Sequence, residues 1–207
     1  GTLLRDGARL AVARDGGATE LVFEEDFLPS VNFDTGECAL EAPMVFVGQG
    51  VFAPELDHDD FAGVDLRGKV AVLLANAPAR FPNDQRAFHA SGLEKLRELE
   101  RRGAVGALFL GDPENEARRA WHLNAPNWAR PGMRLLDRDG RPRDTFPGLG
   151  CRASMRMQRA EVIFAGAPHT TDEVWTMLAE GRLRAFDLKG TIAMASRTRL
   201  EPVTSRN

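Results

Sequence analysis

The sequence predicts a mixed α/β domain that contains both parallel and antiparallel strands. Three observations support this: a strand–helix–strand pattern over residues 69–110, a long alternating segment over 186–200, and a hairpin pattern near the N-terminus. Two buried strands joined through a helix form a parallel crossover, whereas alternating apolar and polar residues are typical of a half-buried antiparallel strand. We therefore expect a β-rich, barrel-like core with flanking helices.

The N-terminal part of the chain predicts a hairpin and then a buried strand. The alternating runs 9–13 and 20–23 flank a turn that contains Gly16 and Gly17, which is the spacing of a hairpin. The apolar run 43–47 follows and ends at Gly48 and Gly50. A glycine pair at this point indicates a close approach of the backbone to another segment.

The crossover unit occupies the middle of the chain. Residues 57–61 predict a helical turn, and the strand 69–75 is apolar on both faces, so it should be central. A polar loop over 76–85 precedes a helix over 91–102, which repeats leucine every third residue and ends at Gly103. Residues 104–110 form the second strand of the crossover.

The rest of the chain divides into an irregular and a regular part. Residues 111–147 lack a sustained period and predict a long irregular excursion, in which Trp121 and Trp128 form either a small core under the loop or a stacking platform. Residues 157–164 predict a helix. Thr170 and Glu173 match a capping box for a further helix that ends at Gly181.

Composition narrows the range of functions. The 207 residues include 27 Lys and Arg against 30 Asp and Glu, a net charge of -3, so nothing favours nucleic acid as a partner. The longest apolar runs are far shorter than the roughly 20 residues of a membrane-spanning helix. The first residues lack the pattern of a signal peptide.

The candidate catalytic groups are few, and we predict no catalytic residue and no metal ligand in this chain. Of four histidines only one lies among carboxylates, in the cluster Asp57, His58, Asp59 and Asp60. A solvated helix cap is the preferred interpretation of this cluster, and a small metal hydrolase built on it is the alternative. The other three are interpreted as surface or capping residues: His89, His122 and His169.

Other kinds of catalytic or ligand-binding motif are incomplete. No serine stands in a Gly-x-Ser-x-Gly elbow, and the glycines at 48 and 50 do not complete a phosphate-binding loop. Cys38 and Cys151 are the two cysteines of the chain. They could form one disulfide in an oxidising compartment, but two lone cysteines are more often small buried residues, and a nucleophilic role for Cys151 is less favoured still.

Several segments resemble the protease-associated domain that is inserted in two-zinc aminopeptidases of metallopeptidase family twenty-eight. The segments are Val-Phe-Val-Gly-Gln-Gly-Val at 45–51, the stretch 59–73 that contains Asp-Asp-Phe and Gly-Lys-Val, Arg-Gly-Ala-Val-Gly-Ala at 102–107, and the final residues 203–207. The resemblance covers about residues 43–207, and the excursion at 111–147 departs from the shortest domains of this type.

The resemblance implies a domain organisation and a role. It implies an N-terminal flanking hairpin segment at 1–42, a protease-associated domain at 43–204, and at 205–207 a junction to a catalytic domain that is absent here. The chain would be a non-catalytic accessory domain of a secreted zinc-dependent aminopeptidase. It would cover the active site and modulate peptide access, and both zinc ions would lie in the catalytic domain.

The same resemblance implies partners and a location, and one alternative stays open. The partners would be the chain's own peptidase domain and peptide substrates, with a periplasmic, secreted or cell-envelope location. The alternative is an interaction or dimerisation module that does not contact substrate.

One loop is the candidate substrate-facing surface. It follows the central strand at its carboxyl end, where α/β sheets present ligand-binding loops, and it carries Arg80, Asn83 and Arg86. These side chains could hold a peptide carboxylate by charge-assisted hydrogen bonds. An ordinary solvated loop is the alternative.

Overall fold

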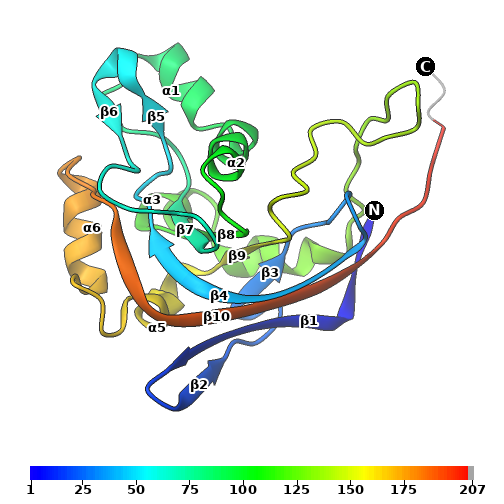
Figure 1. The fold of residues 1–207 in the computed structure, drawn as a ribbon, viewed down its shortest axis with the longest axis horizontal. Coiled ribbons are helices and arrows are strands. Elements are labelled where there is room, and N and C mark those ends of the chain that lie inside the picture. The colour runs from blue at the N-terminus through cyan, green and yellow to red at the C-terminus, as the bar shows by residue number, and fades with distance from the viewer. Residues whose placement is uncertain (205–207) are drawn as a thin grey trace.

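The computed structural model describes residues 1–204, in which one large sheet is surrounded by short helices (Figure 1). The strands are β1 (Thr2–Arg14), β2 (Gly17–Glu20), β3 (Phe27–Pro29), β4 (Glu37–Phe46), β5 (Phe52–Ala53), β6 (His58–Asp59), β7 (Val70–Leu74), β8 (Gly106–Leu110), β9 (Cys151–Met155) and β10 (Phe186–Arg199). The α-helices are α1 (Asn83–His89), α2 (Gly92–Arg101), α3 (Pro113–Arg118), α4 (Trp121–Asn124), α5 (Ala160–Phe164) and α6 (Thr171–Ala179). Three 3-10 helices complete the description: η1 (Pro54–Leu56), η2 (Ala125–Ala129) and η3 (Met157–Arg159).

Eight strands form one mixed sheet in the order β2-β1-β10-β4-β7-β8-β9-β3. The four strands β4, β7, β8 and β9 are parallel to one another, and the remaining pairs are antiparallel. Every residue of β7 is buried, as expected for a central parallel strand. The predicted crossover from β7 through helix to β8 is confirmed, and the mixed α/β class with it.

The two faces of the sheet are covered by different helices. Val72 belongs to a core that includes Phe164 of α5 and Val174 of α6. Leu73 belongs to a core on the opposite face that includes Leu99 of α2. This is the outcome of the two-residue side-chain period of a strand. In Figure 1, α1 and α2 accordingly lie on one side of the strands, and α5 and α6 on the other.

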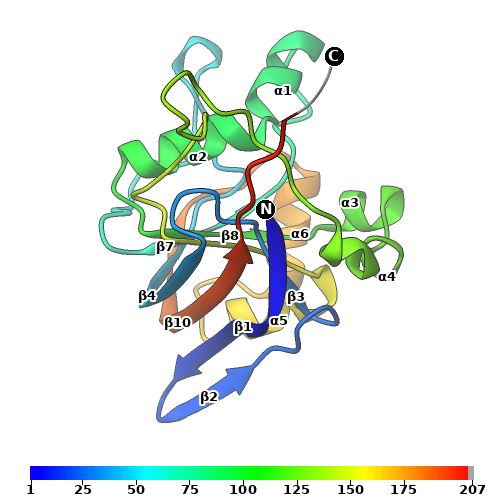
Figure 2. The ribbon, with the colours of Figure 1, turned by 90° about the vertical axis from the view of Figure 1, so that its right-hand side faces the viewer.

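The predicted hairpin and the predicted C-terminal strand pair with each other. β1 and β2 form the hairpin, and β10 lies between β1 and β4 (Figure 2). β10 alternates buried and exposed residues over most of its length, as its sequence pattern predicts. The pairing with β4 shifts register between Asp187 and Thr191. Gly190 lies there at φ +86°, and a Cβ at this position would overlap the Ala13 carbonyl, so the irregularity requires glycine.

A disulfide shows that the sheet curls. It joins Cys38 of β4 to Cys151 of β9, with the two Cα atoms 5.5 Å apart. Two strands, β7 and β8, stand between β4 and β9 in the sheet order, and three strand spacings in a flat sheet would amount to about 14 Å. Curling is therefore required. The preferred interpretation of both cysteines as unpaired small residues is wrong.

Four predicted segments differ from the structure. The second arm of the hairpin, predicted over 20–23, lies earlier in the chain, as β2 at Gly17–Glu20. Residues 57–61 do not form a helical turn, because His58 and Asp59 pair with β5 as the short strand β6. The loop predicted over 76–85 ends at Pro82, where α1 begins. The excursion at 111–147 is only partly irregular, since α3, α4 and η2 lie within it.

The tryptophans of this excursion form a small core, as preferred from the sequence. The Trp128 ring contacts Phe23 edge to face at 5.0 Å between centroids. The Trp121 indole N–H donates to the Glu24 carbonyl at 2.8 Å, and that of Trp128 to the Glu24 carboxylate at 3.1 Å. The excursion is thus fastened to the segment between β2 and β3.

The predicted domain limits fall as follows. The boundary between residues 42 and 43 lies inside β4, which runs continuously from Glu37 to Phe46, while β1 pairs with β10 in the same sheet. The division into segments stays a prediction. The junction at 205–207 lies outside the described residues. Over residues 1–204, no helix has the length and apolar character needed to cross a bilayer.

Candidate functional site

Three loops meet at the carboxyl edge of the parallel strands. Gln49 follows β4, the segment 77–80 follows β7, and Pro113 and Glu114 follow β8. All three line one cavity of about 520 Å³, which we call the loop cavity. Its opposite wall comes from the C-terminal part of α6 and the residues after it, among them Trp175, Leu178, Glu180 and Leu183. The carboxyl edge of a parallel sheet is where such folds place ligands.

Arg80 is an exposed side chain that the protein nevertheless holds in place. Its Nη1 donates to the Leu56 carbonyl at 3.1 Å, and its Nη2 donates to the Asp57 carbonyl at 3.4 Å. The guanidinium also lies over the Phe81 ring, 5.1 Å from the centroid, a cation–π contact. The side chain is thus oriented at the edge of the loop cavity without a carboxylate partner among these contacts.

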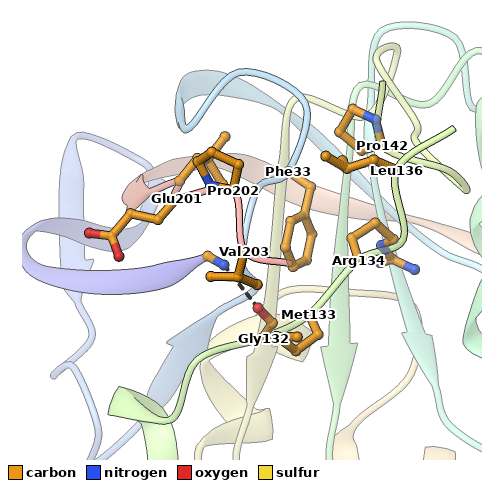
Figure 3. A pocket seen from close by; sticks show the side chains of 11 residues that line it. Phe33, Gly132, Met133, Arg134, Leu136, Pro142, Glu201, Pro202 and Val203 are labelled. Carbon is orange, nitrogen blue, oxygen red and sulfur yellow. Dashed lines mark hydrogen bonds between the residues drawn. The ribbon is translucent and has the colours of Figure 1, made fainter. Parts of the chain in front are cut away.

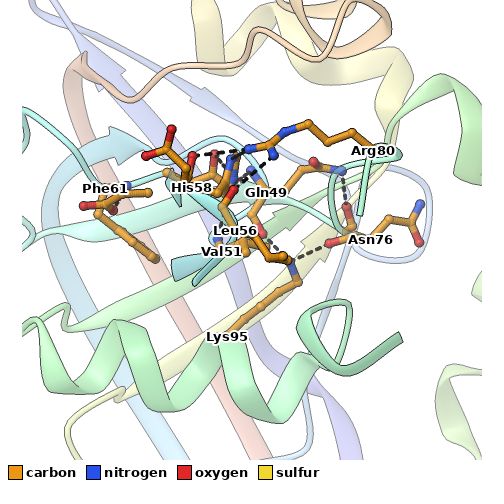
Figure 4. A network of polar contacts seen from close by, with 12 residues as sticks. Gln49, Val51, Leu56, His58, Phe61, Asn76, Arg80 and Lys95 are labelled. Atoms are coloured by element: carbon orange, nitrogen blue, oxygen red, sulfur yellow. Dashed lines mark hydrogen bonds and ion pairs between the residues drawn. The ribbon is translucent and has the colours of Figure 1, made fainter. Parts of the chain in front are cut away.

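His58 connects Arg80 to a buried carboxylate (Figure 4). The Arg80 Nη2 is 3.2 Å from the His58 Nδ1. A guanidinium can only donate, so a hydrogen bond at this contact requires Nδ1 to accept. The other ring nitrogen, Nε2, is 3.1 Å from Oδ1 of Asp60, although the two are poorly aligned for a hydrogen bond. His58 thus lies between Arg80 and the buried carboxylate.

Asp60 is a buried carboxylate that organises the loop after β4. Its Oδ2 accepts the backbone N–H of Gln49 at 3.1 Å and that of Val51 at 3.0 Å. Gly48 has φ +53°, and a Cβ there would lie 2.9 Å from Oδ1 of Asp60. This is the close backbone approach that the glycine pair predicts. Asp60 is only 3% exposed, so the interpretation of the Asp/His cluster as a cap with solvated charges is wrong for this residue, whereas Asp57 and Asp59 are exposed.

Lys95 of α2 joins two of the site loops, and sequence reasoning missed it. Its ammonium group donates to the carbonyl of Gln49 and, at 2.6 Å, to that of Asn76 (Figure 4). The side chain is 2% exposed. Burial lowers its pKa to about 8, and the charge of Asp60 opposes this shift. One signal could have found it: Lys95 lies four residues before Leu99, on the buried face of the helix.

The three predicted substrate-facing residues line two different pockets. Arg80 lines the loop cavity. Asn83 and Arg86, which lie on α1 rather than on a loop, line a second pocket of about 270 Å³ together with Arg118; we call it the helix pocket. The two cavities share Ala77, Ala79 and Glu114. Arg86 therefore lines the same pocket as Asn83, whereas Arg80 lines the other pocket.

Of the three remaining histidines, one differs from the prediction. His89 is buried, with its Nε2 3.2 Å from the Glu55 carboxylate, so the surface or capping interpretation is wrong for this residue. His122 is exposed and His169 is partly exposed. Within residues 1–204, no three His, Cys, Asp or Glu side chains are grouped so that they could hold a metal ion.

A third pocket of about 220 Å³ lies next to the N-terminus (Figure 3). We call it the terminal pocket. Its lining is mostly apolar and includes Phe33, Met133 and Leu136, together with residues 200–203. Arg134 lies over the Phe33 ring, with its Cζ 5.1 Å from the centroid, and the N-terminal ammonium group donates to the Gly132 carbonyl at 2.9 Å.

Of the comparisons with known proteins, only the one with solved structures found matches. No family model and no curated protein sequence matches the chain. Among solved structures it is similar to an aminopeptidase from an Aneurinibacillus species, at 15% identity and a TM-score of 0.38 over 91% of this chain and 32% of that one. It is also similar to a zinc aminopeptidase from Bacillus subtilis, at 15% identity and a TM-score of 0.32 over 93% and 33%. A subtilisin-like protease from an Antarctic Pseudoalteromonas matches at 10% identity, with a TM-score of 0.39 over 93% and 33%. The chain spans about a third of the length of these proteins.

Proposed function

We propose that this chain is a non-catalytic accessory domain of a secreted zinc-dependent aminopeptidase, where it borders the active site and modulates the access of peptides. The observation that carries the proposal is the segment 45–73, on which the resemblance to protease-associated domains is most specific. This segment contains the end of β4, the loop held by Asp60, and β7. It is the part of the fold that positions Arg80 at the loop cavity.

The proposal assigns peptide hydrolysis to a separate peptidase domain. Two-zinc hydrolysis needs several histidine and carboxylate ligands that converge on the metals. The residues that the structure describes contain no such group, and the carboxylate of Asp60 is occupied by backbone N–H groups. Under the proposal, both zinc ions belong to the peptidase domain, which is also the principal partner of this chain.

A location outside the cytoplasm is part of the proposal. The disulfide between Cys38 and Cys151 supports it, because such bonds persist in oxidising compartments and are rare in the cytosol. The periplasm, the cell envelope and the external medium all satisfy this condition.

Kinetics of the full-length protein test the role in peptide binding. Arg80→Ala and Arg86→Ala should each raise KM for peptides several-fold and change kcat little, because the loss affects binding rather than the reacting bond. Arg138→Ala is a matched control, since Arg138 is exposed and lines neither the loop cavity nor the helix pocket. Wild-type KM and kcat in both variants across a panel of peptides would refute the binding role of this surface.

One observation favours the second candidate, an interaction or dimerisation module. Around the terminal pocket Met133 is 71% exposed, Leu136 48% and Val203 67%. Exposed apolar side chains that cluster in this way are typical of protein–protein interfaces. Sedimentation of wild type against Leu136→Glu tests this candidate function. A wild-type dimer that the substitution dissociates, with unchanged peptide kinetics, would favour this function over the first.

A further inference from the structure

The loop cavity has the size and wall chemistry of a ligand site. Its volume of about 520 Å³ lies within the roughly 300–1,000 Å³ typical of small-molecule sites. Its apolar lining comes from Trp175, Leu178 and Leu183 of the α6 segment and from Ala77 and Pro78 of the loop after β7. An apolar group of the size of a leucine or phenylalanine side chain would be desolvated against this lining.

Among the charged side chains of the cavity, Arg80 is the exposed one that has no counter-ion. Glu114 is paired with Arg118 at 2.7 Å, and Glu180 is paired with Arg182. Asp60 is buried, and its Oδ2 accepts two backbone N–H groups. Within residues 1–204, Arg80 has no carboxylate at ion-pair distance; the acceptors around it are two backbone carbonyls and the His58 Nδ1.

The cavity also offers neutral hydrogen-bonding groups. Gln49 is 8% exposed, and its side-chain amide donates one long hydrogen bond, 3.5 Å, to the Ala75 carbonyl. A buried amide that is so weakly satisfied is suited to pair with a peptide group of a ligand.

We propose that the loop cavity binds the C-terminal residue of a peptide, with an apolar side chain against Trp175 and the free α-carboxylate on Arg80. The exposed unpaired charge of the cavity is the guanidinium of Arg80, which attracts a carboxylate. Its contacts to Leu56, Asp57 and His58 use three of its five N–H donors, so the carboxylate would bind the remaining donors on Nε and Nη1. The inference rests on the proposed function only in that it takes a peptide as the carrier of the carboxylate.

The main alternative to a ligand carboxylate is a ligand ammonium group, which carries the opposite charge. The C-terminal end of α6 carries partial negative charge, and Glu180, just after this end, lines the cavity together with Glu114 of α3. Each glutamate is already neutralised by its own arginine. The α6 end is also closed by backbone N–H groups, because Gly181 donates to Leu178 and Arg182 donates to Met177. The carboxylate is therefore the favoured ligand group.

Three peptides distinguish binding of a carboxylate from binding of an ammonium group by the 207-residue chain. They are N-acetyl-Gly-Gly-Leu with a free carboxylate, the same peptide as C-terminal amide, and Gly-Gly-Leu amide with a free amino terminus. Binding is followed by NMR through the indole N–H signal of Trp175, which is assigned by its loss in Trp175→Phe. We expect the free acid to bind at least about fivefold more tightly than either amide.

Arg80→Gln should abolish the preference for the acid, and Arg138→Gln should leave it intact. Equal affinity for acid and amide, tighter binding of the amino-terminal peptide, or a preference that survives Arg80→Gln would each overturn the inference. 4-Methylvalerate, an aliphatic carboxylate without peptide groups, serves as a further probe: binding as tight as that of the peptide acid would overturn the assignment of a peptide. None of these readouts depends on peptidase activity, so failure of this inference and failure of the proposed function are separable.

Discussion

Asp60 is a buried carboxylate whose hydrogen-bond partners are backbone N–H groups rather than a cation. Two donors, at Gln49 and Val51, point at one of its oxygens. Hydrogen bonds to a charged group contribute more to stability than neutral ones. The shape of the loop after β4, and with it one wall of the loop cavity, therefore depends on this side chain.

Replacing Asp60 by asparagine should lower the free energy of unfolding by about 1–3 kcal/mol, because the two N–H groups lose an ionised acceptor. Urea denaturation measures the effect. Asp57→Asn is the matched control: Asp57 is exposed in the same loop at φ +51°, a conformation that asparagine tolerates well. Equal stability of both variants and wild type would mean that Asp60 does not hold the loop.

Lys95 predicts a pH dependence of stability at alkaline pH. Its pKa is lowered in the folded state from 10.5 to about 8, so the unfolded chain binds more protons between these values and stability rises with pH there. Below about pH 8 the lysine is charged in both states and its contribution is constant. Relative to Lys95→Met, the wild type should gain about 3 kcal/mol between pH 7.5 and 10.5.

The measurement is clean because few other groups titrate in this range. The chain has no tyrosine, and its other lysines are Lys69 and Lys189; these are present in both proteins and cancel. Lys189→Met keeps Lys95 and should gain stability with pH as the wild type does, so it is the control for loss of a half-exposed lysine, which is paired with Asp15. A stability difference between wild type and Lys95→Met that does not change with pH would contradict the account of the buried ammonium.

The disulfide fastens β4 to β9 across a separation of 113 residues. A cross-link over a long segment restricts the unfolded chain, and loss of such a bond typically costs about 2–5 kcal/mol. The double variant Cys38→Ala/Cys151→Ala should be destabilised by this amount in urea, with reduced wild type behaving similarly. Thiol titration of the unfolded, unreduced protein should find no free thiol. Two free thiols and an unchanged stability on reduction would contradict the pairing.

The elements that the sequence predicts well are those with a strong local signal. β7 is a continuous apolar run, α2 carries leucines on one face and closes before Gly103, and α6 begins at the capping box of Thr170, which the structure confirms. α1 lacks such a signal, because its first turn follows Pro82 and no side chain caps it. β5 and β6 have two residues each, too few for a period to be recognised.

The parts that could not be predicted depend on contacts between distant segments. The cysteine pair is close only because the sheet curls, and a spacing of 113 residues contains no information on that. The burial of Asp60 and Lys95 depends on loops that follow two different strands. Topology placed the loop after β7 at the carboxyl edge of the sheet, where the structure also has it, and a ligand-facing role for this edge stays a prediction. The assignment of Asn83 and Arg86 to that loop was wrong, because both lie on α1.

The molecule as a whole is a curled sheet that brings the loops after β4, β7 and β8 to one edge, opposite the end of α6. This arrangement creates a cavity with an oriented arginine, and the described residues contain no group of side chains that could hold a metal ion. The cavity is the surface to which the proposed function assigns peptide binding.

Hydrolysis of leucine p-nitroanilide, measured together with zinc content after dialysis, tests the proposed division between binding and chemistry. The 207-residue chain should retain no stoichiometric zinc and show no turnover, whereas the longer gene product that we expect should hold two zinc ions and hydrolyse the substrate. Stoichiometric zinc in the 207-residue chain, with a turnover that His58→Ala abolishes, would contradict the account and identify the Asp57–Asp60 cluster as a metal site.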